Sequence, residues 1–174
     1  MLKQKIIFTI GHSTLKLSEF LIRLKENGIT LLVDIRSIPR SRYNPQFNEM
    51  RLSKYLRKHG IKYVHLNELG GLRHSKKDSI NTGWHNESFR GFADYMLTKE
   101  FKKGLKALIL LSKKDKTAIM CAEAVPWRCH RTLIADMLVI RKYKVLHIIG
   151  KTTKPHSMTS FADVKGTGIT YPGD

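Results

Sequence analysis

The sequence predicts an α/β protein: a single-domain three-layer sandwich with a mostly parallel sheet of about five strands and helices on both faces. Its length of 174 residues fits one domain that can bury a sizeable core. Its short apolar runs are near-continuous rather than alternating, which is typical of strands covered on both faces. Helical patterns lie between these runs, and such alternation favours a mostly parallel sheet.

The expected strands are the short apolar runs themselves. In chain order they cover residues 5–10, 30–34, 62–66, 117–121 and 145–149. Because helical patterns fall between them, the predicted order of elements is β-α-β-α-β-α-α-β-α-β.

The expected helices are defined by apolar residues that recur at helical spacing. The first carries Leu17, Phe20, Leu21 and Leu24, and Gly28 supplies its stop. The others are a helix capped by Asn48 that ends before Gly60, a stripe on Phe89, Phe92, Ala93 and Met96, a helix capped by Thr98 with Phe101, Leu105, Leu108 and Ile109, and a last stripe on Leu133, Ile134, Met137 and Leu138. These stripes are interpreted as core, without chemistry.

Two segments lack a helical or strand pattern. Residues 70–87 are polar and glycine-containing, which predicts a long surface loop. Residues 151–174 contain proline, threonine, serine and glycine, and we expect this tail to pack on the domain. Residues 1–174 are therefore expected to form one α/β domain.

The composition is strongly basic. Thirty-two Lys and Arg residues oppose fourteen Asp and Glu residues, which gives a formal net charge of +18. This excess favours an anionic partner such as a nucleotide, nucleic acid or phosphorylated metabolite, although lysine pairs such as Lys102-Lys103 are also typical of a solvated helix face.

No apolar run approaches the roughly 20 residues of a membrane helix, and no secretory signal is evident, so a cytoplasmic protein without a membrane partner is expected. The oligomeric state is left open.

Polar and reactive side chains follow four of the expected strands directly. Gly11-His12-Ser13 follows the first, residues 34–39 end the second, residues 68–71 follow the third, and Cys121-Ala122-Glu123 ends the fourth. In an open parallel sheet all of these positions lie at the carboxyl edge, where ligands bind. The sequence therefore predicts one site at this edge.

The same segments carry a family resemblance. The motifs are Thr9-Ile10-Gly11-His12-Ser13, residues 34–39 with Ser41 and Arg42, Leu69-Gly70-Gly71, residues 91–96 and residues 121–131. Together they resemble the prokaryotic "domain of unknown function 488" family, over nearly the whole chain. The resemblance implies a compact α/β domain with a shared site, and it implies no particular reaction.

Two carboxylates are candidate catalytic groups. Glu123, just past a strand end, could act as a general acid, base or nucleophile, or form an ion pair with Arg128 or Arg131. Asp34 could hold a metal, a ribose or a reacting hydroxyl, or it could cap the following turn through an Asx-type hydrogen bond.

The two cysteines are candidate nucleophiles with different surroundings. Cys129 lies near a helix start between Arg128 and Arg131, where a thiol pKa is lowered. Cys121 ends a buried strand, where a small hydrophobic residue is the usual interpretation. Their separation does not fit a structural zinc site, so no metal or other cofactor is predicted; a divalent metal is a minor alternative.

The remaining candidates would bind the substrate. Arg36, Arg42 and Arg131 could clamp a phosphate with bidentate hydrogen bonds, or be ordinary surface arginines. Trp127 could stack on a base or form a packing lid. The other expected contacts come from His12, Ser13, Ser37, Glu68 and His130.

These residues support three functional hypotheses. The first is a hydrolase or group transferase acting on a phosphate-bearing substrate such as a nucleotide or nucleic acid. The second is a nucleic-acid-binding or regulatory module without turnover, and the third is a thiol-based redox or sensor protein. Carboxylates at the same edge as the arginines favour the enzyme, because a simple anion binder gains nothing from them.

Overall fold

A computed structural model describes residues 4–174 and confirms the predicted fold class. Its main sheet has six strands in the order β3-β2-β4-β1-β5-β6, and the first five strands of the chain are parallel. These five are β1 (Ile6–Gly11), β2 (Leu31–Asp34), β3 (Lys62–His65), β4 (Thr117–Cys121) and β5 (Lys144–Ile149). Each lies within one or two residues of its predicted position.

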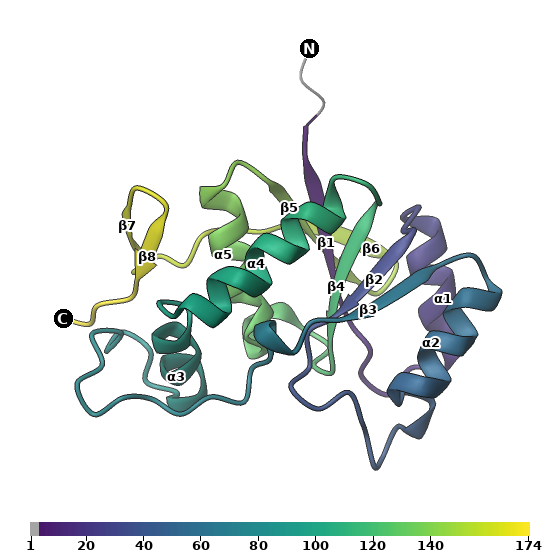
Figure 1. Cartoon of the computed structure of the whole chain (residues 1–174), viewed down its shortest axis with the longest axis horizontal. Coiled ribbons are helices and arrows are strands. Elements are labelled where there is room, and N and C mark those ends of the chain that lie inside the picture. The colour runs from purple at the N-terminus through teal and green to yellow at the C-terminus, as the bar shows by residue number, and fades with distance from the viewer. Residues whose placement is uncertain (1–3) are drawn as a thin grey trace.

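The helices follow the predicted order as well (Figure 1). They are α1 (Leu17–Glu26), α2 (Glu49–Lys58), α3 (Glu87–Tyr95), α4 (Lys99–Ser112) and α5 (Arg131–Ile140). Three short 3-10 turns precede α2, α3 and α5 in the chain: η1 (Pro45–Phe47), η2 (Asn67–Leu69) and η3 (Pro126–Arg128). None of the helices in the described part of the chain combines the length and apolarity that a bilayer crossing requires.

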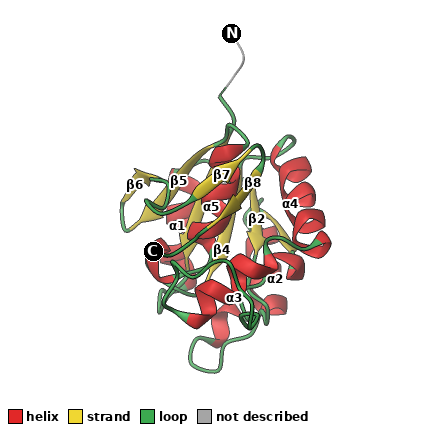
Figure 2. Cartoon of the chain, turned by 90° about the vertical axis from the view of Figure 1, so that its left-hand side faces the viewer, coloured by secondary structure: helices red, strands yellow, loops and turns green. Residues whose placement is uncertain are grey.

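The helices cover both faces of the sheet, as the buried clusters show. Alternating residues of β2 point to opposite faces: Val33 belongs to the cluster that includes Phe92 of α3, whereas Leu32 belongs to the cluster that includes Phe20 of α1. Helices α3, α4 and α5 therefore cover one face, and α1 and α2 cover the other (Figures 1 and 2).

The tail contains three strands that the sequence pattern does not predict. Strand β6 (Thr152–Pro155) pairs antiparallel with β5 and extends the sheet at that edge. Strands β7 (Asp163–Lys165) and β8 (Gly168–Thr170) form a separate hairpin. All of β6 is exposed, so its residues show no apolar run by which a strand could be recognised.

The tail is held to α5 by a buried carboxylate. Asp136, fully buried on α5, accepts hydrogen bonds from the Tyr171 hydroxyl (2.8 Å), the His156 imidazole (2.7 Å) and the Thr159 hydroxyl (2.7 Å). Tyr171 itself is fully buried. These three contacts fasten the tail to α5, and Tyr171 with Ile169 belongs to the buried core on that side of the sheet.

The segment between η2 and α3 contains no helix or strand, in agreement with the sequence, but it is not simply a surface loop. Its Asn81 is fully buried and donates to Asp94 of α3 at 2.8 Å. Asp94 also accepts from the hydroxyl of Ser79 at 2.6 Å and from the backbone N–H of Lys76 at 2.8 Å. These bonds fasten the segment to α3.

Candidate active site

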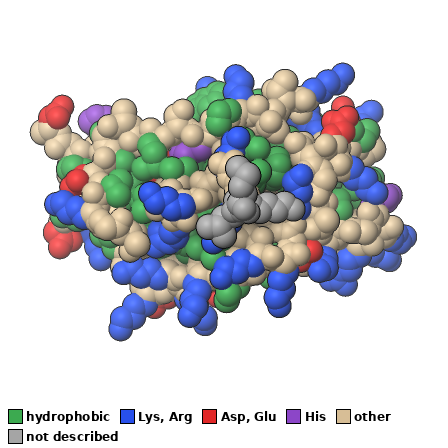
Figure 3. Space-filling model, turned by 90° about the horizontal axis from the view of Figure 1, so that it is seen from above, with side chains coloured by type: hydrophobic (Ala, Val, Ile, Leu, Met, Phe, Trp, Pro, Cys, Tyr) green, Lys and Arg blue, Asp and Glu red, His purple; other side chains and the backbone are tan. Residues whose placement is uncertain are grey.

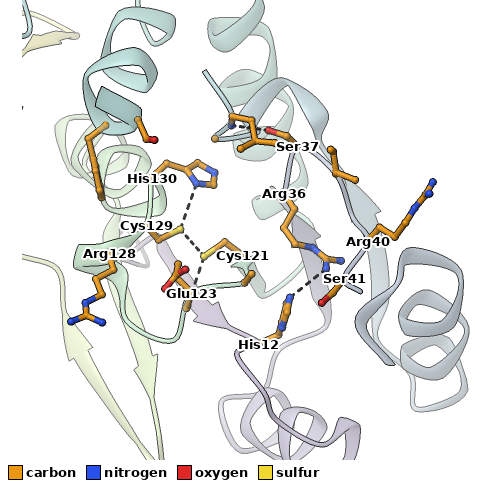
Figure 4. A pocket seen from close by; sticks show the side chains of 16 residues that line it. His12, Arg36, Ser37, Arg40, Ser41, Cys121, Glu123, Arg128, Cys129 and His130 are labelled. Atoms are coloured by element: carbon orange, nitrogen blue, oxygen red, sulfur yellow. Dashed lines mark hydrogen bonds between the residues drawn. The ribbon is translucent and has the colours of Figure 1, made fainter. Parts of the chain in front are cut away.

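A pocket of about 550 Å³ lies at the carboxyl edge of the sheet, where the strand-end segments meet (Figure 4). Segments far apart in the sequence form it: the end of β1, the loop after β2, the start of the loop before α3, α3 itself, and the β4–α5 connection. Its lining consists of His12, Arg36, Ser37, Ile38, Arg40, Ser41, Gly71, Leu72, Ser88, Phe89, Cys121, Ala122, Glu123, Arg128, Cys129 and His130.

Gly11 allows the β4–α5 connection to cross closely over the end of β1. A Cβ at this position would overlap the backbone carbonyl of Glu123. The two segments also remain paired beyond the ends of β1 and β4. The backbone N–H groups of His12 and Ser13 donate to the backbone carbonyls of Cys121 (3.0 Å) and Ala122 (2.8 Å). The segment that carries Cys121 and Glu123 is therefore held firmly against β1.

The two cysteines lie in contact at the pocket wall. The sulfur atoms of Cys121 and Cys129 are 2.6 Å apart, with Cys129 donating its S–H to Cys121. Arg131, which is fully buried, donates through Nη1 to the Cys121 sulfur at 2.6 Å and to the carbonyl of Glu123 at 2.6 Å. Its Nη2 donates to the carbonyl of Ala124 at 3.1 Å. The Cys121 sulfur thus faces a fixed positive charge and a thiol donor.

These contacts make Cys121 the more acidic thiol. Burial by itself raises its pKa, but the Cys129 hydrogen bond and the Arg131 charge together outweigh burial and lower the pKa. Burial and the neighbouring Cys121 raise the pKa of Cys129 well above its ordinary value. The sequence-based assignment of the lowered pKa to Cys129 is therefore wrong, because the Arg131 side chain folds back toward Cys121.

His130 is a neutral hydrogen-bond acceptor beside this pair. Its Nε2 donates to the backbone carbonyls of Ile35 (3.2 Å) and Leu69 (3.0 Å), which leaves Nδ1 unprotonated. That Nδ1 lies 3.5 Å from the Cys129 sulfur. Burial lowers the pKa of His130 to about 4, so the ring carries no charge at neutral pH.

Asp34 is occupied by structural hydrogen bonds. It is fully buried and accepts from the Nη2 of Arg36 at 2.6 Å, from the backbone N–H of Arg36 at 3.1 Å, and from the Tyr63 hydroxyl at 2.6 Å. Asp34 lies outside the pocket lining. The structure corrects its assignment as a catalytic group and matches the alternative of an Asx-type cap on the following turn.

His12 connects the Asp34–Arg36 pair to the pocket. Its Nδ1 donates to the carbonyl of Ser13 at 2.8 Å, so its Nε2 can accept from Nη1 of Arg36 at 3.3 Å. The ring stacks on Phe47 with centroids 4.3 Å apart. Burial lowers the pKa of His12 to about 4, and the imidazole is neutral at pH 7.

Two buried histidines, His12 and His147, and the half-buried His130 predict a loss of stability in mild acid. Burial lowers the pKa of His12 and His130 to about 4 and that of His147 on β5 to about 3. Unfolded histidine titrates near pH 6.5, so between about pH 6.5 and pH 4 the unfolded chain binds protons that the folded protein does not. We expect the free energy of unfolding to fall over this range by up to about 1.4 kcal/mol per histidine per pH unit, measured by urea unfolding.

Substitution of one histidine tests the cause of this effect. His147→Gln should reduce the slope of the free energy of unfolding against pH by about the contribution of one histidine. His85→Gln changes an exposed side chain and should leave this slope unchanged. Equal stability of the native chain at pH 7 and at about pH 5 would contradict the expectation.

The pocket lining contains some of the residues expected from the sequence and omits others. Cys121, Glu123 and Cys129 line it, as do four of the expected binding residues: His12, Arg36, Ser37 and His130. Five of the expected binding residues lie outside the lining, as Asp34 does: Ser13, Arg42, Glu68, Trp127 and Arg131. Glu68 lies beside Gly104 of α4. Arg131 cannot clamp a phosphate, because it is fully buried and both of its terminal nitrogens, Nη1 and Nη2, bind Cys121 or backbone carbonyls.

Other residues of the lining were not expected from the sequence. The positions of Arg40 and Arg128 in the sequence could have identified them as lining residues. Arg40 lies between Arg36 and Arg42, and Arg128 directly precedes Cys129. Leu72 and Phe89 carried no such signal, because only the folded path of the loop before α3 brings them to the pocket. Within residues 4–174, no group of three or more His, Cys, Asp or Glu side chains is arranged to hold a metal ion.

Fold and site together define an α/β protein with a pair of contacting cysteines in a cationic pocket at the carboxyl edge of its sheet. The chain belongs to the family described as "Domain of unknown function DUF488", whose family model matches residues 16–138. The matched segment includes most of the pocket lining, with His12 just before it. No curated protein and no solved structure was found to match the chain.

Proposed function

We propose that this protein is a hydrolase or group transferase in which Cys121 is the nucleophile and the substrate carries a phosphate or similar anion. The observation that carries the proposal is the pair of 2.6 Å contacts that the Cys121 sulfur receives from Arg131 and Cys129 at the pocket wall. A thiolate is the reactive form of cysteine, and a nearby guanidinium and thiol donor favour that form at neutral pH.

The charge of the pocket supports an anionic substrate. Three arginines, Arg36, Arg40 and Arg128, line it, against the single carboxylate of Glu123. Arg36 is held by Asp34 and directs Nη1 toward His12, whereas Arg40 and Arg128 are exposed. Guanidinium groups recognise phosphate oxygens through paired N–H donors, so this set suits a phosphate group close to the nucleophile.

In the proposed reaction, the Cys121 sulfur forms a bond to the electrophilic atom of the substrate. The bond to the leaving group breaks, and the leaving group departs with the bonding electron pair. A water or acceptor hydroxyl then displaces Cys121, and Glu123 takes its proton and passes it on to the leaving group or to solvent. One substrate bond is exchanged for another, and there is no net oxidation or reduction.

The covalent intermediate provides the test. Native protein is mixed with a panel of phosphate monoesters, diesters and nucleotides, quenched in acid and digested with trypsin, which cleaves after Arg128 and so separates the two cysteines. We expect a substrate-derived mass on the Cys121 peptide, more of it in Glu123→Gln, and none in Cys121→Ser. Full turnover of any panel substrate by Cys121→Ser would refute the proposal.

The contact between the two sulfurs also favours a second candidate, a dithiol reductase. Cys121 would attack a substrate disulfide and Cys129 would resolve the mixed disulfide, so that two protein thiols and one disulfide become one protein disulfide and two free thiols. Oxidised glutathione is the probe. Cys129→Ser, whose hydroxyl can still donate to Cys121, should halt the reduction at the mixed disulfide but leave the hydrolase reaction in place, and this difference separates the two candidates.

A further inference from the structure

Two large aromatic side chains are exposed close to the pocket. The Tyr43 side chain is 89% exposed and lies two residues beyond Ser41, and the Trp127 side chain is 61% exposed and directly precedes Arg128. Ser41 and Arg128 both line the pocket, and Figure 4 shows them on opposite sides of Cys121. Exposed rings of this kind provide flat surfaces on which planar groups can stack.

The other tryptophan, Trp84, packs against neighbouring aromatic rings, unlike Tyr43 and Trp127. Trp84 is half-buried, stacks on Phe89 with ring centroids 4.9 Å apart, and contacts the rings of Phe161 and Tyr171. Its packing explains its presence, whereas the exposure of Tyr43 and Trp127 leaves most of each ring open to solvent.

Solvent-exposed arginines lie next to both of these aromatic residues in the sequence. Arg40 and Arg42 lie within three residues of Tyr43, and Arg128 follows Trp127. All three are exposed, and none belongs to the ion pairs found within residues 4–174. They are therefore available to phosphate groups on both sides of the pocket.

The pocket itself has room for one planar, partly apolar group beside Cys121. The side chains of Ile38 (59% exposed) and Leu72 (71% exposed) form apolar parts of its lining together with half-buried Phe89. A volume of about 550 Å³ lies within the range of pockets that bind small ligands of nucleotide size. A free nucleotide would fill this pocket but leave Tyr43 and Trp127 unused.

We propose that the substrate is a single-stranded nucleic acid, with the reacting nucleotide in the pocket and neighbouring bases stacked on Tyr43 and Trp127. This inference rests on the proposed function for the identity of the reacting site. A single strand is favoured because its bases are free to stack on side chains, whereas the bases of a duplex stack on one another. Net charge alone does not make this distinction, since Lys and Arg side chains are also scattered over the face on the side of the N-terminus (Figure 3).

The test is binding of a fluorescent oligonucleotide of about ten nucleotides, within the site sizes typical of such proteins. The Cys121→Ser chain is used, so that no reaction can consume the probe. Tyr43→Ala and Trp127→Ala should each weaken binding about fivefold to a hundredfold, while Tyr43→Phe and Trp127→Phe should keep most of the affinity. A duplex of the same length and the mononucleotide should bind much more weakly.

Salt dependence provides the matched test of the arginines. Each phosphate contact on a single strand contributes about −0.7 to the slope of log affinity against log salt concentration. Arg40→Met should therefore reduce the steepness by about that amount, and Lys106→Met, an equal loss of charge on the exposed side of α4, should leave binding by the pocket face nearly unchanged.

Three results would overturn the inference: equal affinity for single strand and duplex, no effect of either alanine substitution, or equal affinity for the mononucleotide. Failure of the proposed chemistry appears elsewhere, as the absence of a covalent mass on Cys121. Because binding is measured without the Cys121 thiol, the two failures are distinguishable.

Discussion

Replacement of Arg131 by methionine is expected to raise the pKa of Cys121 and to slow its alkylation by iodoacetamide at pH 7 by about tenfold or more. Arg131 places a buried positive charge 2.6 Å from the sulfur, and a change of one pKa unit alters the thiolate fraction about tenfold. The rate is measured as a function of pH by mass spectrometry of the tryptic peptide that contains Cys121.

Two further variants distinguish charge from folding. Arg131→Lys keeps a cation at the site and should give an intermediate rate if the variant retains the native circular dichroism spectrum. Arg141→Met makes the same substitution at the other end of α5, where the arginine donates to the Met137 carbonyl, and should leave the rate unchanged. Equal alkylation profiles for native protein and a folded Arg131→Met variant would show that Arg131 does not activate Cys121.

Asp34→Asn is expected to destabilise the protein by about 3–5 kcal/mol. The substitution leaves the Arg36 guanidinium, only 7% exposed, without its carboxylate, and it places an amide donor among groups that already donate. The side chain of Arg36 would lose its fixed position, and His12 would lose the donor to its Nε2. Urea unfolding at neutral pH measures the loss.

Asp115→Asn is the matched control for this substitution. Asp115 pairs with Lys62 at 3.0 Å, but the lysine side chain is 69% exposed, so the pair should contribute less than about 1 kcal/mol. A loss below about 1 kcal/mol in Asp34→Asn would show that the buried pair with Arg36 contributes no more than this exposed one.

The fold was predictable because its signals are local. Apolar runs such as residues 117–121 and helical stripes such as Leu17 to Leu24 are visible in the sequence alone. They also determine which segments end at the carboxyl edge, and this led correctly to the end of β1, the end of β4 and the loop after β2. Strand β6 was missed because its exposed residues pair through the backbone without an apolar pattern.

The chemistry of the site was less predictable because it depends on which side chain turns inward. Sequence spacing places Arg131 near both cysteines, but only the folded structure shows that its guanidinium is buried against Cys121. Similarly, nothing local to Asp34 indicates that Tyr63, from the neighbouring strand, donates to it. Two of the assignments that the structure corrects, Asp34 as a catalytic group and Arg131 as a phosphate clamp, concern side chains with 0% exposure.

Helix α5 links the candidate active site to a part of the chain outside the family match. Its first residue, Arg131, contacts Cys121, and Asp136, little more than one turn later, accepts hydrogen bonds from His156, Thr159 and Tyr171. These three donors lie beyond residue 138, where the match to the family ends. Without them the buried carboxylate of Asp136 would lack hydrogen-bond donors, and the helix that holds Arg131 against Cys121 would lose its anchor. We therefore expect any relative that carries a carboxylate at this position to supply equivalent donors from its own C-terminal sequence.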